Sequence, residues 1–349
     1  MQILILSDVH VARNTPWSKG WEDVDFLISS LKKKREETPF PTFDGAIFCG
    51  DLLNTPRVLP GDVVKFVELM EVLGLDKVPV GWVNGNHDPG DFCIAEVLPK
   101  AVNLNEETLF GVAGHNFSQN LEEVRDWLRA CQAPVTVTHQ SASMFMDLGK
   151  GLSERLADKQ LRPEDFHAPL NFVGDTHVTS VFTVGDVNCV SPGIPVPMRS
   201  RKELFDSNPC LMVWDFDGSD VAGSEIRTIE LPKRPYVHVT DAAQRLPEYR
   251  ASDLPLLLFM SGSIRKEFDL SDYSDYPIRI IEYSDTVTDL EAVLDQPLEN
   301  YSADTVDDII SAAQSILPED SPNYSDILSV TRSLLTSEDP DIIVKDYLK

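Results

Sequence analysis

Positively charged side chains are scarce in this sequence. It has 30 Lys and Arg residues against 57 Asp and Glu residues, which gives a formal net charge of −27 at pH 7. Non-specific binding to nucleic acid depends on neutralising phosphates with Lys and Arg, so this composition disfavours it over the surface as a whole. A local nucleic-acid site remains compatible with this charge where bound metal supplies the positive charge.

Paired cysteines and long apolar runs are also lacking. The five cysteines are an odd number without Cys-X-X-Cys spacing, and we expect Cys49, Cys189 and Cys210, which lie in apolar runs, to be small buried thiols. No apolar stretch reaches membrane-spanning length. The first strand-like run, residues 3–6, begins almost at the initial Met, which argues against a cleavable leader. These features predict a cytoplasmic protein without membrane contact.

One construction recurs five times along the chain. A short apolar run, typical of a buried strand, ends in Asp, Asn or His. The five runs are ILILSDVH with Asp8 and His10, GAIFCGD with Asp51, VPVGWVNGNHD with Asn86, His87 and Asp88, PVTVTH with His139, and LNFVGDTH with Asp175 and His177. Four of the seven histidines therefore follow predicted strands.

Helical patterns separate these runs. Apolar residues recur at helical spacing over residues 21–31, 63–73 and 121–131. Strands that alternate with helices predict a layered α/β domain, with the strand ends gathered along one edge.

Two interpretations of Asn84-Gly85-Asn86 are open. Asn-Gly is a strong turn signal, while polar residues at a strand end are typical of a ligand-bearing loop. The clustering of Asp, Asn and His at five strand ends favours metal ligation, and the two interpretations are compatible. A mixed nitrogen and oxygen set suits Mn²⁺, Fe, Zn²⁺ or Mg²⁺, and its carboxylates can hold two divalent ions roughly 3.5–4 Å apart, as in phosphate-ester hydrolases.

In order, the motifs DVH, GDLLN, GNHD, VTHQ and GDTH resemble those of the calcineurin-like metallophosphoesterases. Within that superfamily the chain looks most like the SbcD-type nucleases. Three features carry this resemblance: a long insert after GNHD, the segment VSPGIPVPMRSRKE after the fifth motif, and a further domain followed by a helical tail. The compact size, the acidity and the divergent fifth motif look like a phage-encoded version.

The resemblance implies a role for each motif residue. Asp8, His10 and His177 would bind the first ion, Asp51 would bridge both ions, and Asn86, His139 and Asp175 would bind the second. The ions would be two Mn²⁺, with Mg²⁺ as the alternative. His87 would contact the scissile phosphate or protonate the leaving oxygen, and Asp88 would orient His87 from behind.

Position 175 departs from the usual family pattern, which places a histidine there. An aspartate adds negative charge at the second ion and favours Mn²⁺ or Mg²⁺ over softer ions. The alternative is that Asp175 turns away and water fills the site.

We predict three parts: a metallophosphoesterase catalytic domain over residues 1–230, a small α+β capping domain over 231–300, and a helical partner-binding tail over 301–349. Basic candidates for DNA contact are Arg199, Arg201 and Lys202 after the fifth motif, with surface solubility as their alternative role. Further candidates in the capping domain are Lys233, Arg234, Arg265 and Lys266.

These features predict a metal-dependent DNA exonuclease or endonuclease, the catalytic subunit of an SbcCD-like recombination and repair complex. Its partners would be DNA and an SbcC-type coiled-coil ATPase, with a second copy of the chain as a further candidate. The alternatives are a phosphodiesterase or phosphatase for a small phosphate ester and a non-catalytic scaffold subunit. A phage-encoded protein would work in the host cytoplasm.

Overall fold

A computed structural model describes residues 1–15, 19–37, 39–90, 92–145, 160–195, 209–216, 221, 224–247, 255–273 and 277–283. The predicted tail and the candidate DNA contacts Arg199, Arg201 and Lys202 lie outside the described residues. The division into three domains therefore stays a prediction.

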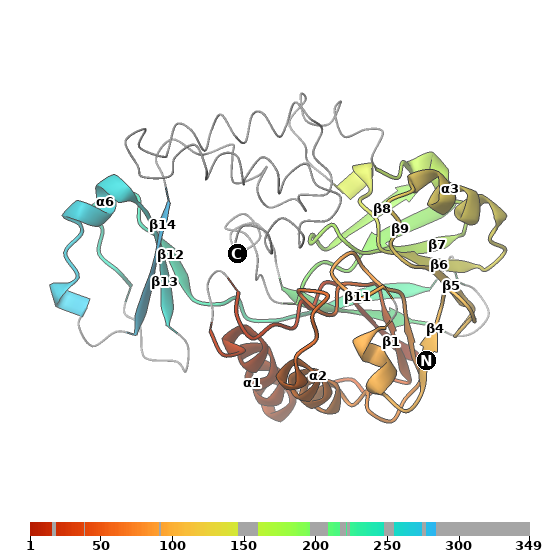
Figure 1. Ribbon diagram of the computed structural model, residues 1–349, viewed down its shortest axis with the longest axis horizontal. Helices are drawn as coiled ribbons and strands as arrows, with labels where there is room; N and C mark the ends of the chain where they lie inside the picture. The colour runs from red at the N-terminus through yellow and green to blue at the C-terminus, as the bar shows by residue number, and fades with distance from the viewer. Residues whose placement is uncertain are drawn as a thin grey trace, which may run out of the picture. The chain divides into compact units, whose positions relative to one another are not determined.

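The first sheet has six strands in the order β11-β10-β1-β2-β3-β4 (Figure 1). Its four parallel members are β1 (Gln2–Leu6), β2 (Gly45–Phe48), β3 (Val80–Trp82) and β4 (Ala101–Asn103). Its two antiparallel members are β10 (Cys210–Asp215) and β11 (Glu225–Glu230). Parallel pairing brings the carboxyl ends of β1, β2 and β3 to the same edge.

The second sheet has five strands in the order β5-β6-β7-β9-β8. Four are parallel: β5 (Val112–His115), β6 (Val135–Thr138), β7 (Leu170–Val173) and β9 (Val187–Ser191). The edge strand β8 (Ser180–Val184) runs antiparallel to β9. All five strand runs with polar ends are thus confirmed, three in the first sheet and two in the second.

The three predicted helices are confirmed as α1 (Glu22–Glu37), α2 (Pro60–Leu73) and α3 (Leu121–Ala130). Helix α2 begins with Pro60, which needs no amide partner in the first turn, and ends at Gly74 in the left-handed conformation. The short 3₁₀ turns are η1 (Ile94–Val97), η2 (Ser143–Phe145) and η4 (Pro163–Asp165). Within the described part of the chain, no helix is long and apolar enough to cross a membrane.

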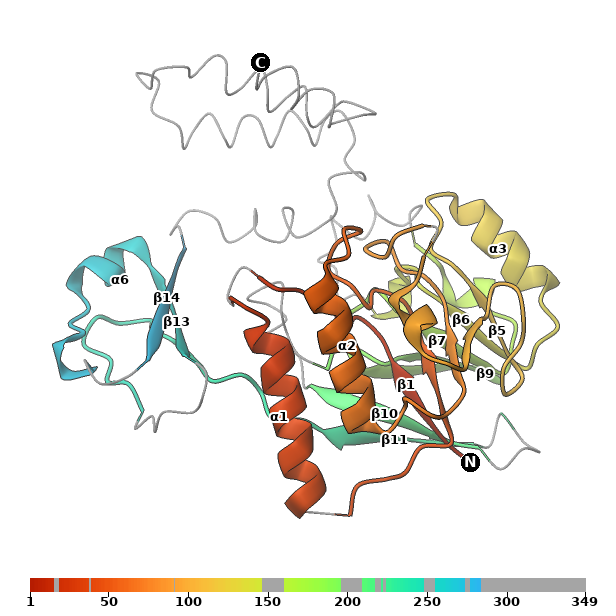
Figure 2. The same cartoon turned by 60° about the horizontal axis from the view of Figure 1, so that its bottom comes forward.

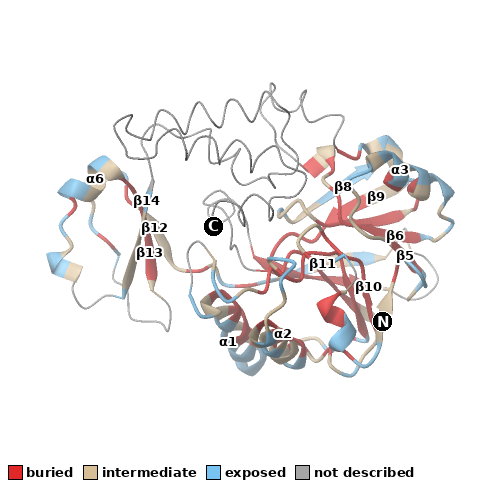
Figure 3. Ribbon diagram, in the orientation of Figure 1, coloured by how far each residue is buried: buried red, intermediate tan, exposed pale blue. Residues whose placement is uncertain are grey.

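Alternating burial along the strands creates the layers. Leu4 and Phe48 face α1 and α2, which run side by side on one face of the first sheet (Figures 1 and 2). Ile3 and Ile47 face the opposite way and pack with Val135 and other residues of the second sheet. On the far side of the second sheet, α3 packs against residues of β7 and β9. The order is helix, sheet, sheet, helix. The central strands of both sheets are buried, whereas the edge strand β8 is mostly exposed and the edge strand β11 is half-buried to exposed (Figure 3).

A separate parallel sheet lies in the region predicted as the capping domain. Its order is β12-β13-β14, with β12 (Tyr236–His238), β13 (Leu256–Ser261) and β14 (Ile278–Tyr283). It carries α6 (Gly262–Glu267) and η5 (Ser271–Tyr273), and it has an apolar cluster of its own around Leu258 and Met260.

One basic candidate of this region is not available to DNA. The Arg234 side chain is 0% exposed, and its guanidinium donates to the buried Asp23 carboxylate in the first turn of α1. Arg279 on β14 donates to both carboxylate oxygens of Glu22 at 2.8 and 2.9 Å. The expectation that Arg234 contacts DNA is therefore wrong, because the burial of Asp23 requires a cation beside it.

The cysteine prediction is confirmed. Cys49, Cys189 and Cys210 are buried free thiols, and burial raises the pKa of each.

Candidate metal centre

The polar residues that follow β1, β2 and β3 meet those that follow β6 and β7. The first three strands belong to one sheet and the other two to the second. The candidate site is therefore built across two packed sheets, with each sheet supplying part of the ligand set.

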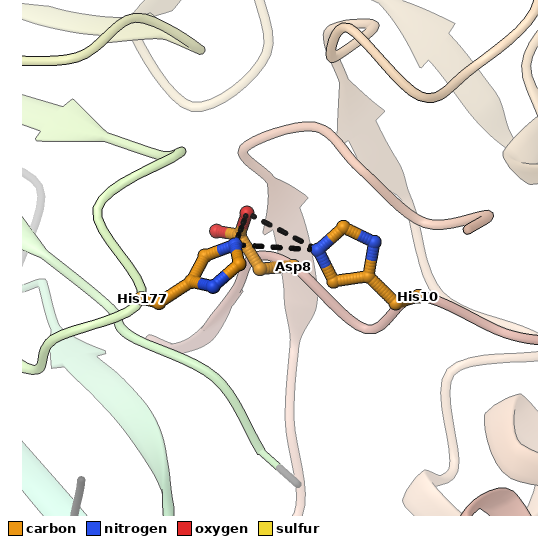
Figure 4. Close-up of side chains that lie close together, drawn as sticks. All are labelled: Asp8, His10 and His177. Carbon is orange, nitrogen blue, oxygen red and sulfur yellow. Dashed lines mark hydrogen bonds and ion pairs between the residues drawn. The ribbon is translucent and has the colours of Figure 1, made fainter. Parts of the chain in front are cut away.

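Asp8, His10 and His177 form the first group (Figure 4). Asp8 Oδ1 lies 3.1 Å from His177 Nε2 and 3.8 Å from His10 Nε2. The two Nε2 atoms are 3.3 Å apart. Figure 4 shows the two rings approaching the Asp8 carboxylate from different loops, so one oxygen and two nitrogens surround a common point.

The second group gathers around His139. Its Nε2 lies 3.1 Å from Asn86 Oδ1, 3.4 Å from Asp51 Oδ2 and 3.9 Å from Asp175 Oδ1. The Asp175 carboxylate therefore faces the cluster and is not turned away from it. Asp51 Oδ2 also lies 3.7 Å from His10 Nε2, which places it between the two groups.

Two observations show that these residues fit a divalent cation. Asp51 Oδ2 is buried and accepts no hydrogen bond from any residue that the structure describes, which is costly for a carboxylate unless a cation lies beside it. His139 Nδ1 donates to the Cys49 carbonyl at 2.7 Å, so that in the neutral ring Nε2 holds the lone pair that a metal requires.

The charges of the pocket favour a cation strongly. Burial raises the pKa of both Asp8 and Asp51. The neighbouring His177 lowers the pKa of Asp8, and His139 lowers that of Asp51. The histidines outweigh burial, so the pKa of each carboxyl group lies below its ordinary value. Burial lowers the pKa of His139, yet Asp51 and its neighbours raise it to about 10. Without metal, the carboxylates thus favour a proton on the imidazole, and a metal ion bound at Nε2 would displace it.

The backbone is unusual at the same residues. Seven described residues other than glycine have positive φ, and five of them are Asp8, His10, Asp51, Asp175 and His177, with φ between 49° and 71°. This conformation is rare for residues with a side chain, and such departures cluster at functional sites.

Glycine permits the close approach of these loops. A Cβ at Gly85 would lie 2.1 Å from Asp51 Oδ1, and one at Gly174 would lie 2.2 Å from the Cys49 carbonyl oxygen. These two motifs therefore need their glycines because the backbone passes directly against a neighbouring loop of the site.

The structure corrects the expected role of Asp88. Its two oxygens accept the backbone amides of Leu53 at 3.1 Å and Gly85 at 2.9 Å, so it holds two loops together. The His87 ring is oriented by a different group, the carbonyl of Asn54, to which Nδ1 donates at 3.0 Å. His87 Nε2 lies 4.0 Å from Asp51 Oδ2, at the edge of the cluster.

Three polar residues of the site were missed by sequence reasoning. Ser7 donates to Asp8 Oδ2, Ser141 donates to Asp175 Oδ2, and Asn116 Oδ1 accepts the amide of Asn84 at 3.0 Å. Ser7 and Ser141 adjoin the motifs and were detectable by position alone. His115 also ends a strand, β5, but its Nδ1 donates to the Asn116 carbonyl at 2.7 Å and its ring packs on Trp127.

Three solved structures are similar to this chain over about two thirds of its length. The protein TT1561 of Thermus thermophilus is 14% identical with a TM-score of 0.36, over 65% of this chain and 98% of its own. Vps29 of Entamoeba histolytica, solved with Zn²⁺, is 15% identical with a TM-score of 0.32, over 66% and 99%. Vps29 of Chaetomium thermophilum is 14% identical with a TM-score of 0.31, over 67% and 97%.

No curated protein matches the chain significantly. The sequence model of the calcineurin-like phosphoesterase superfamily domain matches residues 1–213, which is more than half of the 349 residues and contains every candidate ligand. The chain therefore belongs to the calcineurin-like phosphoesterase superfamily.

Proposed function

We propose that this protein is a two-metal DNA nuclease of SbcD type, with Mn²⁺ as the preferred ion. The observation that carries the two-metal proposal is the position of Asp51 Oδ2, 3.7 Å from His10 Nε2 in one group and 3.4 Å from His139 Nε2 in the other. A single carboxylate between two ligand groups is placed to serve an ion on each side.

In this proposal Asp8, His10 and His177 hold the first ion, while Asn86, His139 and Asp175 hold the second. Two bound divalent ions would supply activation of a water molecule and neutralisation of charge on the phosphoryl oxygens. Asp51 holds both sides of the site together, and its Oδ1 accepts the amide of His87 at 2.8 Å. The same carboxylate thus fixes the loop that carries His87.

His87 acts on the leaving oxygen. Its Nδ1–H is occupied by the Asn54 carbonyl, so Nε2 is the ring atom directed toward the cluster. In its protonated form, a ring fixed in this way can donate a proton or a hydrogen bond from Nε2 to an oxygen of the substrate.

The DNA substrate rests on the motif resemblance and on the separate β12-β13-β14 unit, which corresponds to the predicted capping domain. One observation favours the alternative, a small phosphate ester. Arg234 and Arg279 are paired with acidic residues of α1, so two basic side chains of this unit do not present free charge to a phosphate backbone. The net charge of −27 points the same way.

The deciding experiment compares three substrates: labelled duplex DNA, labelled single-stranded DNA and a chromogenic phosphodiester, each with Mn²⁺, Mg²⁺ or EDTA. The proposal predicts metal-dependent cleavage of DNA, with Asp51→Ala as the matched inactive control. Turnover of the chromogenic diester without cleavage of either DNA would support the small-substrate alternative. Inactivity on all three substrates would support a scaffold subunit.

We also propose that the segment 301–349 docks on an SbcC-type ATPase. The segment carries ten acidic and three basic residues, and its two apolar stripes, beginning at Val306 and Tyr324, match the helix-in-groove mode of binding. A chain ending before Tyr301 should retain metal-dependent hydrolysis but lose the ATPase in co-purification. Equal recovery with both chains would reject this role.

A second proposed partner is another copy of the chain. Light scattering of the full-length protein tests this by measuring its molar mass in solution.

A further inference from the structure

Ser141 and Asp175 are brought together by neighbouring strands. Ser141 lies shortly after β6 and Asp175 shortly after β7, and these parallel strands pair Thr138 with Val173 at their carboxyl ends. Residues that follow the two strands by a few positions are therefore side by side at one edge of the sheet.

The two oxygens of Asp175 have different surroundings. Oδ2 accepts a hydrogen bond from the Ser141 hydroxyl, while Oδ1 lies 3.9 Å from His139 Nε2, on the side of the second ligand group. The Asp175 amide donates to Asp8 Oδ2 at 3.3 Å, which fixes the backbone of this residue at its φ of 71°.

Ser141 is itself held in place. Its carbonyl accepts the amide of Leu161 at 2.9 Å, and the next residue, Ala142, is buried and bridges to Leu161. The hydroxyl is thus presented by a fixed backbone.

A carboxylate ligand is better oriented when it makes such a contact. The terminal torsion of aspartate is broad, so a lone Asp175 would offer either oxygen, or neither, to a cation. A hydrogen bond to one oxygen selects the rotamer and leaves the other oxygen for ligation, as second contacts to metal ligands generally do.

We propose that Ser141 is a positioning residue that orients Asp175 as a ligand of the second metal ion. This inference rests on the proposed function only in requiring a second ion. Ser141 does not touch substrate or metal itself.

The test is calorimetric titration of the full-length protein with Mn²⁺ alone. Ser141→Ala should weaken binding of the second ion by roughly 10–100-fold and leave the first ion unchanged. Ser141→Thr, which keeps the hydroxyl, should restore most of the affinity. Ser143→Ala, two positions further along at the start of η2, is the matched control and should bind both ions as the unaltered protein does.

A double-variant comparison separates orientation of Asp175 from a general structural effect. In an Asp175→Ala background, Ser141→Ala should cause no further loss of Mn²⁺ affinity, because the group that it orients is gone. A further loss there would overturn the inference, as would unaltered second-ion binding in the single variant or binding of only one ion by the unaltered protein. Hydrolysis is assayed separately, so two-ion binding without DNA cleavage would reject the proposed nuclease and leave this inference standing.

Discussion

At the scale of single residues, the site depends on a small number of side chains whose polar atoms each have a defined contact or position. Asp51 illustrates this best, since Oδ1 accepts the His87 amide at 2.8 Å and Oδ2 lies between the two ligand groups. His87 is held by a backbone carbonyl, and Asp88 by two backbone amides. Substitutions at these positions should therefore have separable effects.

Asp51→Ala should abolish metal-dependent hydrolysis and lower bound Mn²⁺, because the lost carboxylate faces both groups of ligands. Metal content measured by mass spectrometry after Mn²⁺ loading and gel filtration checks this expectation. Full Mn²⁺ content together with retained activity would contradict the placement of Asp51 at the metal centre.

His87→Ala should leave the Mn²⁺ content near normal and lower kcat by roughly 10²–10⁴, the range typical of one acid–base group. Single-turnover kinetics with a phosphodiester substrate measure the chemical step directly. His115→Ala is a suitable control, because that histidine lies at a strand end but belongs to neither ligand group. Loss of one ion from the His87 variant would instead identify it as a ligand.

At the scale of elements, the N-terminus of α1 is joined to the β12-β13-β14 unit by ion pairs. Asp23 in the first turn is buried with Arg234, accepts the Thr15 hydroxyl at 2.9 Å, and lies beside Glu22, which is paired with Arg279. Thr15 follows the loop that carries His10, so one network links that loop, the helix and the small sheet.

Arg234→Ala should destabilise the protein by about 3–5 kcal/mol, the usual cost of leaving a buried charge without its partner. Urea unfolding measures the loss, and adding Asp23→Asn should recover part of it because the uncompensated charge is removed. Lys266→Ala, at an exposed position on α6, is the control and should have little effect. An Arg234→Ala variant as stable as the unaltered protein would show that the buried pair contributes nothing.

At the scale of the whole molecule, the charge of −27 and the buried acids of the site make folding and cation binding interdependent. A ligand that binds only the folded state stabilises it by about 2.7 kcal/mol at 100 times its Kd. The site is well formed across two sheets, and it does not exist in an unfolded chain.

Mn²⁺ at that level should therefore raise the Tm by roughly 4 °C over the value in EDTA. Thermal unfolding followed by tryptophan fluorescence checks this. NaCl at matched ionic strength controls for simple screening of the acidic surface. Asp51→Ala should lose most of the shift, and an equal shift in that variant would place the stabilising ions elsewhere.

The sequence by itself determined five strands, three helices and the candidate ligands that follow those strands. Apolar runs that stop at polar residues predicted the five strands, and the order of the motifs at their ends indicated the family. Helical spacing predicted α1, α2 and α3. These features are local, because the spacing of apolar residues in a helix or strand, and the polar residues that end a strand, can be recognised within a short stretch of sequence.

Only the tertiary structure decided that the strands form two sheets, since a parallel strand carries no local sign of which sheet it joins. Contacts between distant loops were equally hidden: Asp88 holds Leu53, Ser141 contacts Asp175, and Arg234 contacts the buried Asp23. In each case a polar side chain is fixed by a partner far away in sequence, and the identity of that partner depends on packing that exists only after the chain has folded.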